Sequence, residues 1–241
     1  CEKPGALRSI DIKKNSVLAQ KKKLTYMISY NHRFHDAFMK ARKLYEKGAI
    51  GDIISVRARY GFGGRIGYDR EWRLNKNVSG GGHLLDQGVH MIDLALSFIG
   101  SPQKVSGMLS DTFWKKGVED NAFVLIKGKN NAIASIHSSL TQWKPLHNFE
   151  VYGTRGFMAI EGLGRKYGDG EKLIIGTRSK NFSDLPREKI IDCNPHADDS
   201  LKYTLEEFMS AIKTNRPPTP NASDAYATLK VVEEVYKNNT L

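Results

Sequence analysis

Cysteine is scarce in this sequence. Only Cys1 and Cys193 are cysteines among 241 residues, and no C-x-x-C spacing occurs. Two separate cysteines cannot supply the disulfide framework of a small secreted domain or the ligand pattern of a structural zinc site. We therefore expect no bound metal and a reducing compartment, which favours a cytoplasmic location.

Long hydrophobic runs are also lacking. The longest, at residues 91–99, is interrupted by Asp93 and is far shorter than the roughly 20 residues that a membrane-spanning helix needs. The chain begins at Cys1 without the charged and apolar regions of a signal peptide. We expect no membrane partner, and a chain that starts partway through a longer protein.

Positive charge is in excess, because 37 Lys and Arg against 26 Asp and Glu give a formal net charge of +11. Such an excess can serve nucleic acid, a membrane surface or an anionic small molecule. The lysine clusters are short and lie beside helix and turn signals, where solvated faces are the ordinary explanation. No zinc-finger or RNP pattern accompanies them, so we expect no nucleic-acid partner.

Helical and alternating patterns succeed each other in the first sixty residues. Helical spacing covers residues 9–22 and 34–47, and Gly48 closes the second helix. A short strand is expected at residues 24–29, and alternation predicts a half-buried strand at residues 53–60.

Beyond Pro102 the apolar residues recur at every second position. The expected strands are 105–112, 121–127, 132–140, 149–152, 157–160, 172–177 and 189–192. Because short turns rich in Gly and Asn join several of them, they should be antiparallel neighbours. Two helices follow, at residues 201–214 and 222–238. We expect an α+β fold, with a large open antiparallel sheet and helices on one face.

The stretch "SGGGHLLDQGVHMIDLALSFIG" at residues 79–100 sets ionisable groups into an apolar helical pattern. On a helix, Asp86 and His90 are four residues apart and Asp93 is three further on, so all three share one stripe. Burying them is costly unless they pair or face a polar cavity, and a carboxylate one turn away can raise the basicity of an imidazole. Asp86 and His90 are therefore a candidate general base, and Asp93 is expected to be structural.

Three glycines, at residues 80–82, lie where this helix begins. They remove side chains at a helix N-terminus, where anions bind and ligands can approach the backbone. We expect them to leave room for a ligand. Two alternatives stay open: Asp86 and His90 satisfy each other in the core, or they bind a metal, although no third ligand is spaced nearby.

Three shorter segments are further candidates for a site. "CEKP" at residues 1–4 is interpreted as a strand end, and "YNHRF" at residues 30–34 lies between an expected strand and helix, where α/β sites collect. "EWR" at residues 71–73 precedes the glycines. Simpler explanations are a surface lysine, a helix N-cap at Asn31 followed by surface residues, and Trp72 in the core.

In this order the segments resemble the Gfo/Idh/MocA family of NAD(P)-dependent oxidoreductases. The resemblance covers essentially the whole chain, and the ordered set is more specific than any single motif. The matching segments are "EKP" (2–4), "SYNHRF" (29–34), "KGAIGDIISVRA" (47–58), "EWR" (71–73), "GGGHLLDQGVHMIDL" (80–94), "VYGTRGFMAIEG" (151–162) and "FMSAIKTNRPPTPNASDAYATLKVVEEVY" (208–236).

The resemblance implies an N-terminal Rossmann domain and a C-terminal α+β domain whose open sheet builds dimers or tetramers. Residues 1–31 would be a remnant of the cofactor domain. Residues 32–241 would form the substrate-binding and oligomerisation domain, with helix 222–238 packing back on the cofactor domain. The family's phosphate-binding glycine motif should precede "EKP", and "GFGGRI" and "GGGHLL" lack its third glycine. We expect this chain alone to bind NAD(P) poorly.

The resemblance also implies a reaction. The hydroxyl-bearing carbon of a sugar, inositol or sugar nucleotide would give hydride to NAD or NADP while His90 takes the hydroxyl proton. Asp86 would orient and polarise His90, and Lys3 would hold the hydroxyl and stabilise the developing alkoxide. The expected cofactor contacts are Glu2, Lys3, Asn31, Trp72 and Arg73, and the expected substrate contacts are Tyr30, Arg33, Tyr68 and His90.

The arginines Arg57, Arg59, Arg65 and Arg70 favour an anionic substrate such as a nucleotide sugar. Two other functions stay open at this point. One is an NAD-dependent glycosidase of the same fold, in which oxidation is transient and a glycosidic bond is lost. The other is a non-catalytic oligomerisation module.

Overall fold

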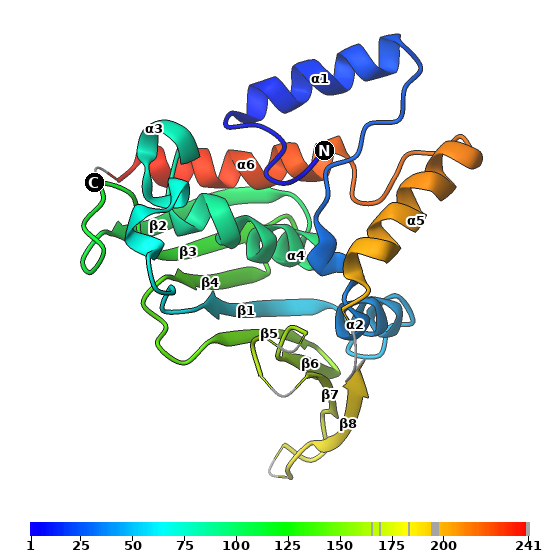
Figure 1. Cartoon of the computed structure of the whole chain (residues 1–241). Coiled ribbons are helices and arrows are strands. Elements are labelled where there is room, and N and C mark those ends of the chain that lie inside the picture. Colours follow the sequence, from blue (N-terminus) through cyan, green and yellow to red (C-terminus); the bar gives the residue numbers. More distant parts are fainter. Residues whose placement is uncertain (165, 169, 183, 194–197, 240–241) are drawn as a thin grey trace.

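One eight-stranded sheet organises the computed structural model, which describes residues 1–164, 166–168, 170–182, 184–193 and 198–239 (Figure 1). Its strands are β1 (Ile53–Gly61), β2 (Pro102–Ser110), β3 (Asn121–Gly128), β4 (Ile133–Ser139), β5 (Leu146–Gly153), β6 (Gly156–Glu161), β7 (Glu171–Thr177) and β8 (Arg187–Cys193). They lie in the order β2-β3-β4-β1-β5-β6-β7-β8. The alternating sequence pattern predicts each of them, with ends that differ by a few residues.

Strand β1 makes the sheet mixed. It pairs antiparallel with β5 but parallel with β4, from Ser55 opposite Ile133 to Gly61 opposite Ser139, where the sequence predicts an antiparallel sheet throughout. It is inserted between β4 and β5, which follow each other in the chain. Alternating apolar residues and turn residues predict hairpins between consecutive strands. They do not predict the insertion of a strand from a distant part of the chain. The expected α+β class is otherwise confirmed.

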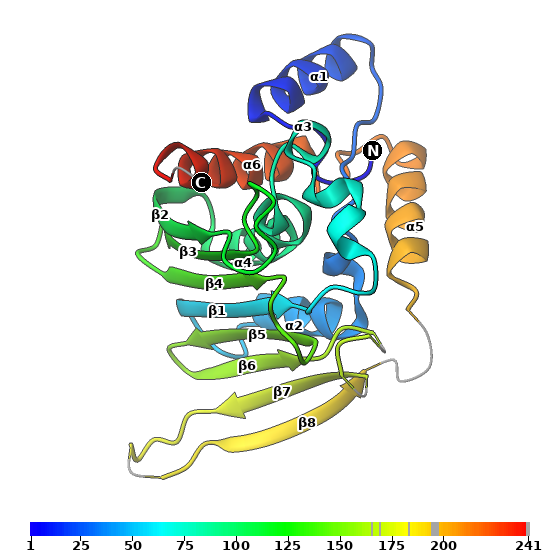
Figure 2. The ribbon, with the colours of Figure 1, turned by 60° about the vertical axis from the view of Figure 1, so that its left-hand side comes forward.

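Helices cover one face of the sheet. The α-helices of the described residues are α1 (Ser9–Lys21), α2 (Asp36–Glu46), α3 (Lys76–Ser79), α4 (Val89–Ile99), α5 (Ser200–Lys213) and α6 (Ala222–Lys237). Helices α2, α4 and α6 pack on the sheet, and α1 packs on α6 (Figures 1 and 2). No helix in the described ranges is both long and apolar enough to span a bilayer.

The strand expected at residues 24–29 does not form. Ser29 makes a single parallel bridge with Glu2, and the N-terminal ammonium group of Cys1 donates to the Met27 carbonyl at 2.9 Å. The isolated bridge to Glu2 does not extend into a ladder in the described residues. The prediction was therefore wrong except at its last residue.

Helix α4 lies in the core. Met91, Ile92 and Leu94 are buried, and the helix contacts β1 and β4 as well as α6. A helix that is apolar nearly all round is expected to be buried, and each such side chain contributes roughly 1.5–3 kcal/mol. The helix that carries His90 is consequently held firmly against the sheet.

The opposite face of the sheet exposes apolar side chains. Met108, Phe123, Leu125 and Ile133, on β2, β3 and β4, are each about half exposed or more, and Phe123 stacks on the ring of His137. We call the four apolar residues the open-face patch. Contiguous apolar patches of this kind mark interaction surfaces more often than free surface.

Strands β1, β2, β4 and β6 end at the same edge of the sheet, as does β8. β1 and β4 are parallel, and β2 and β6 run the same way, because one antiparallel strand separates each from that pair. The segments that follow β1, β2, β4 and β6 begin at residues 62, 111, 140 and 162. They meet at this edge, and the turn at Asn31–Phe34 reaches it from the side.

Candidate functional site

A cavity of about 400 Å³ lies where these segments meet. It is lined by Asn31, His32, His35, Tyr60, Phe62, Gly64, Arg65, Tyr68, Arg73, Asp86, Gln87, Pro145, Leu163, Lys166, Tyr167 and Asp198. Aromatic walls with a few convergent polar groups are typical of a small-molecule site.

A larger cavity, of about 720 Å³, lies on the other side of α2. Most of its charged residues pair with each other: Arg42 with Glu46, and Arg216 with Glu207. The smaller cavity brings together ionisable groups with perturbed pKa values, which are more typical of functional sites. It is therefore the better candidate despite its size.

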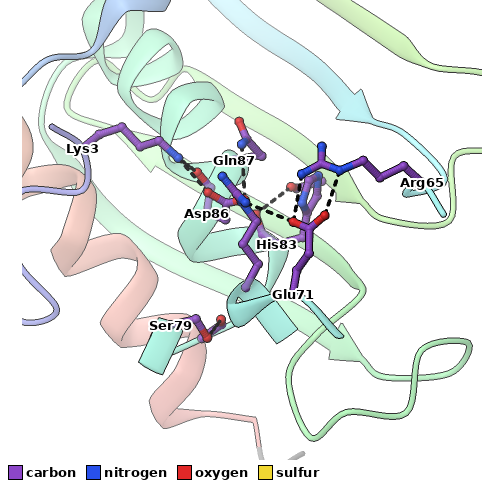
Figure 3. A network of polar contacts seen from close by, with 10 residues as sticks. Lys3, Arg65, Glu71, Ser79, His83, Asp86 and Gln87 are labelled. Carbon is purple, nitrogen blue, oxygen red and sulfur yellow. Dashed lines mark hydrogen bonds and ion pairs between the residues drawn. The ribbon is translucent and has the colours of Figure 1, made fainter. Parts of the chain in front are cut away.

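Lys3 and Asp86 form an ion pair at the wall of the smaller cavity (Figure 3). The Lys3 ammonium lies 2.9 Å from Asp86 Oδ1 and also donates to the Asp86 carbonyl oxygen. Arg73 Nε lies 3.3 Å from Asp86 Oδ2, and the Gln87 amide donates to the same oxygen. Burial alone would raise the pKa of Asp86, but Lys3 and Arg73 outweigh it and lower the pKa. Asp86 is therefore an ionised carboxylate held between two cations.

The backbone at Leu84–Gly88 is a π-helical turn that leads into α4. Its wider winding breaks the four-residue stacking that a regular helix would give to Asp86 and His90. In the described residues no hydrogen bond joins these two side chains, and Asp86 turns instead to Lys3 and Arg73. The expected shared stripe is thus corrected by the geometry of this turn. Such π turns are frequent at functional sites.

His90 lies directly behind the cavity wall. It is buried, and its ring stacks on His32 with centroids 3.8 Å apart and planes at 12°. Its Nδ1 has no hydrogen-bond partner within the described ranges. Burial, and then the charge of Lys3, lower the pKa of His90 well below the ordinary value. The ring is therefore neutral, and of the two stacked imidazoles it is His32 that lines the cavity.

A second buried pair, His35 with Glu171, lies at the cavity. His35 Nδ1 and Glu171 Oε1 are in hydrogen-bond contact, and Glu171 also accepts from the N–H groups of Ala37 and Gly164. Burial would raise the pKa of Glu171, but the hydrogen bond from His35 lowers it. The pair joins the start of α2 to the segment that carries Tyr167, a wall residue.

The glycines at residues 80–82 do not leave open room. A Cβ on Gly82 would collide with the backbone of Glu119, and one on Gly81 with the hydroxyl of Tyr236. The Glu119 carboxylate accepts from the N–H groups of Gly82 and Leu84 at 2.9 and 3.0 Å. Tyr236 donates to the same carboxylate at 2.7 Å. The expectation of space for a ligand is corrected: the glycines admit protein groups that cap the helix start.

Only some of the residues expected to contact the cofactor lie at the cavity. Asn31 and Arg73 line the cavity, and Lys3 reaches it through Asp86. Trp72 is half exposed, with the Arg73 guanidinium 4.8 Å above its ring. Glu2 lies outside, in a groove beside α5.

Only some of the residues expected to contact the substrate line the cavity. Tyr68 lines the cavity, whereas Tyr30 is buried behind it, edge-on to His90. Arg33 faces the larger cavity and binds Asp93 through two hydrogen bonds of 2.7 and 2.6 Å. Burial raises the pKa of Asp93 although Arg33 opposes it. Asp93 thus forms a buried structural pair, as its depth in the helix predicts.

The four arginines that favour an anionic substrate lie apart. Arg65 lines the cavity and pairs with Glu71. Arg57 and Arg59 project from the exposed side of β1, and Arg70 is at the surface. Only one of the four is placed to meet a ligand in the cavity.

Several wall residues were missed by the sequence reasoning. The simpler explanation of the "YNHRF" segment makes His32 and His35 surface residues after a helix cap, yet both are buried. A usable signal is the three-residue spacing of the two histidines, which places them on one side of the turn at Asn31–Phe34. Tyr60 on β1 and Tyr167 in the segment between β6 and β7 have rings 4.9 Å apart, and no local pattern connects them.

Comparison with known proteins agrees with this architecture. The family model of the GFO/IDH/MocA C-terminal domain matches residues 38–159. Levoglucosan dehydrogenase of Pseudarthrobacter phenanthrenivorans is 26% identical over 183 residues, covering 65% of this chain and 47% of that protein. Myo-inositol 2-dehydrogenase of Thermotoga maritima is 24% identical over 249 residues, covering 97% of this chain and 70% of that protein.

A solved structure of levoglucosan dehydrogenase in complex with NADH has the same fold. The TM-score is 0.85 at 23% sequence identity, over 99% of this chain and 71% of that chain. The match to the first of the two curated relatives spans about half of its length.

Proposed function

Because the chain belongs to the Gfo/Idh/MocA family, we propose that it forms the substrate-binding part of an NAD(P)-dependent oxidoreductase. The enzyme moves a hydride between the hydroxyl-bearing carbon of a sugar, inositol or sugar nucleotide and the nicotinamide. The names of the relatives, a levoglucosan and a myo-inositol dehydrogenase, support this substrate class.

The observation that carries the proposal is the Lys3–Asp86 ion pair at the cavity wall. A cation held in place before the substrate arrives stabilises the alkoxide that develops when a hydroxyl loses its proton. Asp86 fixes the Lys3 ammonium and remains ionised because its pKa is lowered. We assign Lys3 the stabilising role and Asp86 the role of holding it.

We assign proton acceptance to His90. Its lowered pKa keeps the ring neutral, which is the form that can accept a proton. His32 stacks on His90 and lines the cavity. A hydroxyl bound at this wall is thus beside His32, with His90 stacked behind it, and is close to the Lys3–Asp86 pair on the other side.

NAD or NADP, when bound, supplies the hydride acceptor. The side chains present fit the nicotinamide end of such a cofactor: Trp72 offers an exposed ring face braced by Arg73, and Asn31 offers an amide at the cavity. They do not fit its pyrophosphate, because the glycine motif that binds it is not in this sequence.

We also infer the assembly and location. Residues 1–31 belong with the cofactor domain, and α6 connects the two parts, since the Glu233 carboxylate on α6 accepts from Ser9 N–H and Oγ–H of α1. The open-face patch supports a homodimer or homotetramer. The free thiols of Cys1 and Cys193 are compatible with the cytoplasm.

The proposal is tested by incubating the complete gene product with sugars, inositols and sugar nucleotides in the presence of NAD or NADP. We expect net formation of reduced nicotinamide, and loss of it in Asp86→Asn but not in Asp11→Asn, which removes only the ion pairs with Arg8 and Lys14 at α1. Free sugar released without net reduced cofactor would identify a glycosidase instead.

A further inference from the structure

Two aromatic side chains beside the cavity are unusually exposed. Trp143 is 63% exposed and Phe113 is 55% exposed, and their rings meet edge to face with centroids 4.8 Å apart. They come from the segments after β4 and β2, which end at the same edge of the sheet (Figure 2). Exposed aromatic rings gathered at one place indicate a contact surface.

This aromatic pair is continuous with the cavity wall. Phe113 packs on Trp114 at 5.3 Å, and Trp114 packs on Tyr68 at 5.5 Å. Tyr68 lines the cavity, as does Pro145, two residues after Trp143. An aromatic surface therefore runs from inside the cavity to its outer rim.

The backbone holds this surface in a fixed shape. Asp120 Oδ2 accepts from the N–H groups of Phe113 and Trp114 at 2.7 and 3.1 Å, and Trp114 Nε1–H donates to the Leu140 carbonyl. Trp143 lies flat against Gly63, where a Cβ would come within 2.6 Å of its ring. A ligand that stacks here would need little rearrangement of the protein.

Lysines surround the aromatic rim. Lys144 follows Trp143, Lys115 and Lys116 follow Trp114, and Lys166 lines the cavity. The lysines that form ion pairs in the described ranges lie elsewhere in the chain, so the charge of these four is not neutralised. The rim therefore combines flat aromatic faces with free positive charge.

We propose that Trp143, Phe113 and Lys144 form an outer subsite for the nucleoside diphosphate of a sugar-nucleotide substrate. The base stacks on Trp143, the diphosphate lies against Lys144 and Lys166, and the sugar reaches the cavity. This inference rests on the proposed function and narrows its substrate class.

Two other occupants fit the rim less well. A second, uncharged sugar ring would use the aromatic faces but leave the lysines without a partner. A second copy of the chain would bring like charges together across a two-fold axis, because both copies present the same lysines. Stacking and phosphate contacts together explain both features of the surface.

The test is calorimetric binding of UDP to this chain, with inorganic diphosphate and maltose as comparison ligands. We expect saturable UDP binding that is tighter than that of either comparison ligand. Trp143→Ala should weaken it about tenfold or more. Lys144→Ala should weaken both UDP and diphosphate. Phe182→Ala, which removes a more exposed aromatic ring between β7 and β8, should leave UDP binding unchanged.

Three results would overturn the outer subsite. The first is that Trp143→Ala leaves the affinity for UDP unchanged. The second is that maltose binds more tightly than UDP. The third is that sedimentation shows Trp143→Ala only dissociating a dimer. Failure of the proposed hydride-transfer function would give a different result. UDP would still bind at Trp143, but the complete gene product would reduce no nicotinamide.

Discussion

The ammonium group of Lys3 lies 2.9 Å from Oδ1 of Asp86, across 83 positions of sequence. This pair joins the first residues of the chain to the π turn before α4, and Arg73 contacts the other carboxylate oxygen. Two cations on one carboxylate fix it at the cavity wall in its ionised form. The pair is the feature on which the proposed chemistry depends.

Asp86→Asn should lower the free energy of unfolding by about 1–3 kcal/mol near neutral pH, because two cations lose their shared partner. The native pKa of Asp86 is lowered, so its contribution is complete above the ordinary value of 3.8 and is lost as the pH falls through the native pKa. Urea unfolding at neutral pH and well below pH 3.8 measures this. A difference between wild type and Asp86→Asn that does not shrink in acid would contradict the assignment.

Buried neutral histidines should make the fold sensitive to acid. Burial lowers the pKa of His83 and of His147 to about 3, from 6.5. Between these values the unfolded chain binds more protons than the native one, so stability falls as the pH drops from about 6.5 towards 3, by up to about 1.4 kcal/mol per pH unit for each group.

The measurement for these histidines is urea unfolding across this range for the wild type and His147→Phe. The substitution should make the pH dependence shallower. His137→Phe, on the half-exposed side of β4, is the control, since burial lowers the pKa of His137 less completely. An equal slope in all three proteins would show that His147 is not buried in its neutral form.

Sequence periodicity was sufficient to predict which segments form strands, but not which strands pair with each other. The alternation of β1 predicts a half-buried strand, and this is what forms. Its parallel pairing with β4, under the shared contact with α4, joins distant segments and is not encoded by any local pattern. The same limit applies to residues 24–29, whose β-like composition finds no ladder in the structure.

The site, like the fold, was predicted from the sequence only in part. Lys3, Asp86 and His90 could be selected from motifs, and the structure brings Lys3 and Asp86 into contact. The π turn, which separates Asp86 from His90, begins where Glu119 and Tyr236 fill the space at the glycines. Those contacts come from distant parts of the chain, so the sequence pattern gives only the regular-helix spacing.

Tyr236→Phe should destabilise the protein by about 1.5–3 kcal/mol, because its hydroxyl is a buried donor to the Glu119 carboxylate. Tyr152→Phe is the matched control: its hydroxyl contacts Glu150 at the surface, and we expect a change within about 0.5 kcal/mol. Thermal unfolding compares the two. Equal effects would mean that Tyr236 does not hold the start of the helix.

Phe123→Lys should shift the protein to a smaller assembly in sedimentation velocity, because it places a charge in the open-face patch. Ile10→Lys changes an exposed apolar residue on α1, on the other side of the molecule (Figure 1), and should leave the assembly unchanged. If the assembly persists in Phe123→Lys, the interface lies elsewhere.

The most direct measurement is the rate of nicotinamide reduction by the complete gene product carrying His90→Asn. If His90 accepts the hydroxyl proton, the rate with the best sugar or polyol substrate falls about 100-fold or more, while His137→Asn, on the open face of the sheet, stays near the wild-type rate. A rate for His90→Asn within a few-fold of wild type would contradict the proposed mechanism.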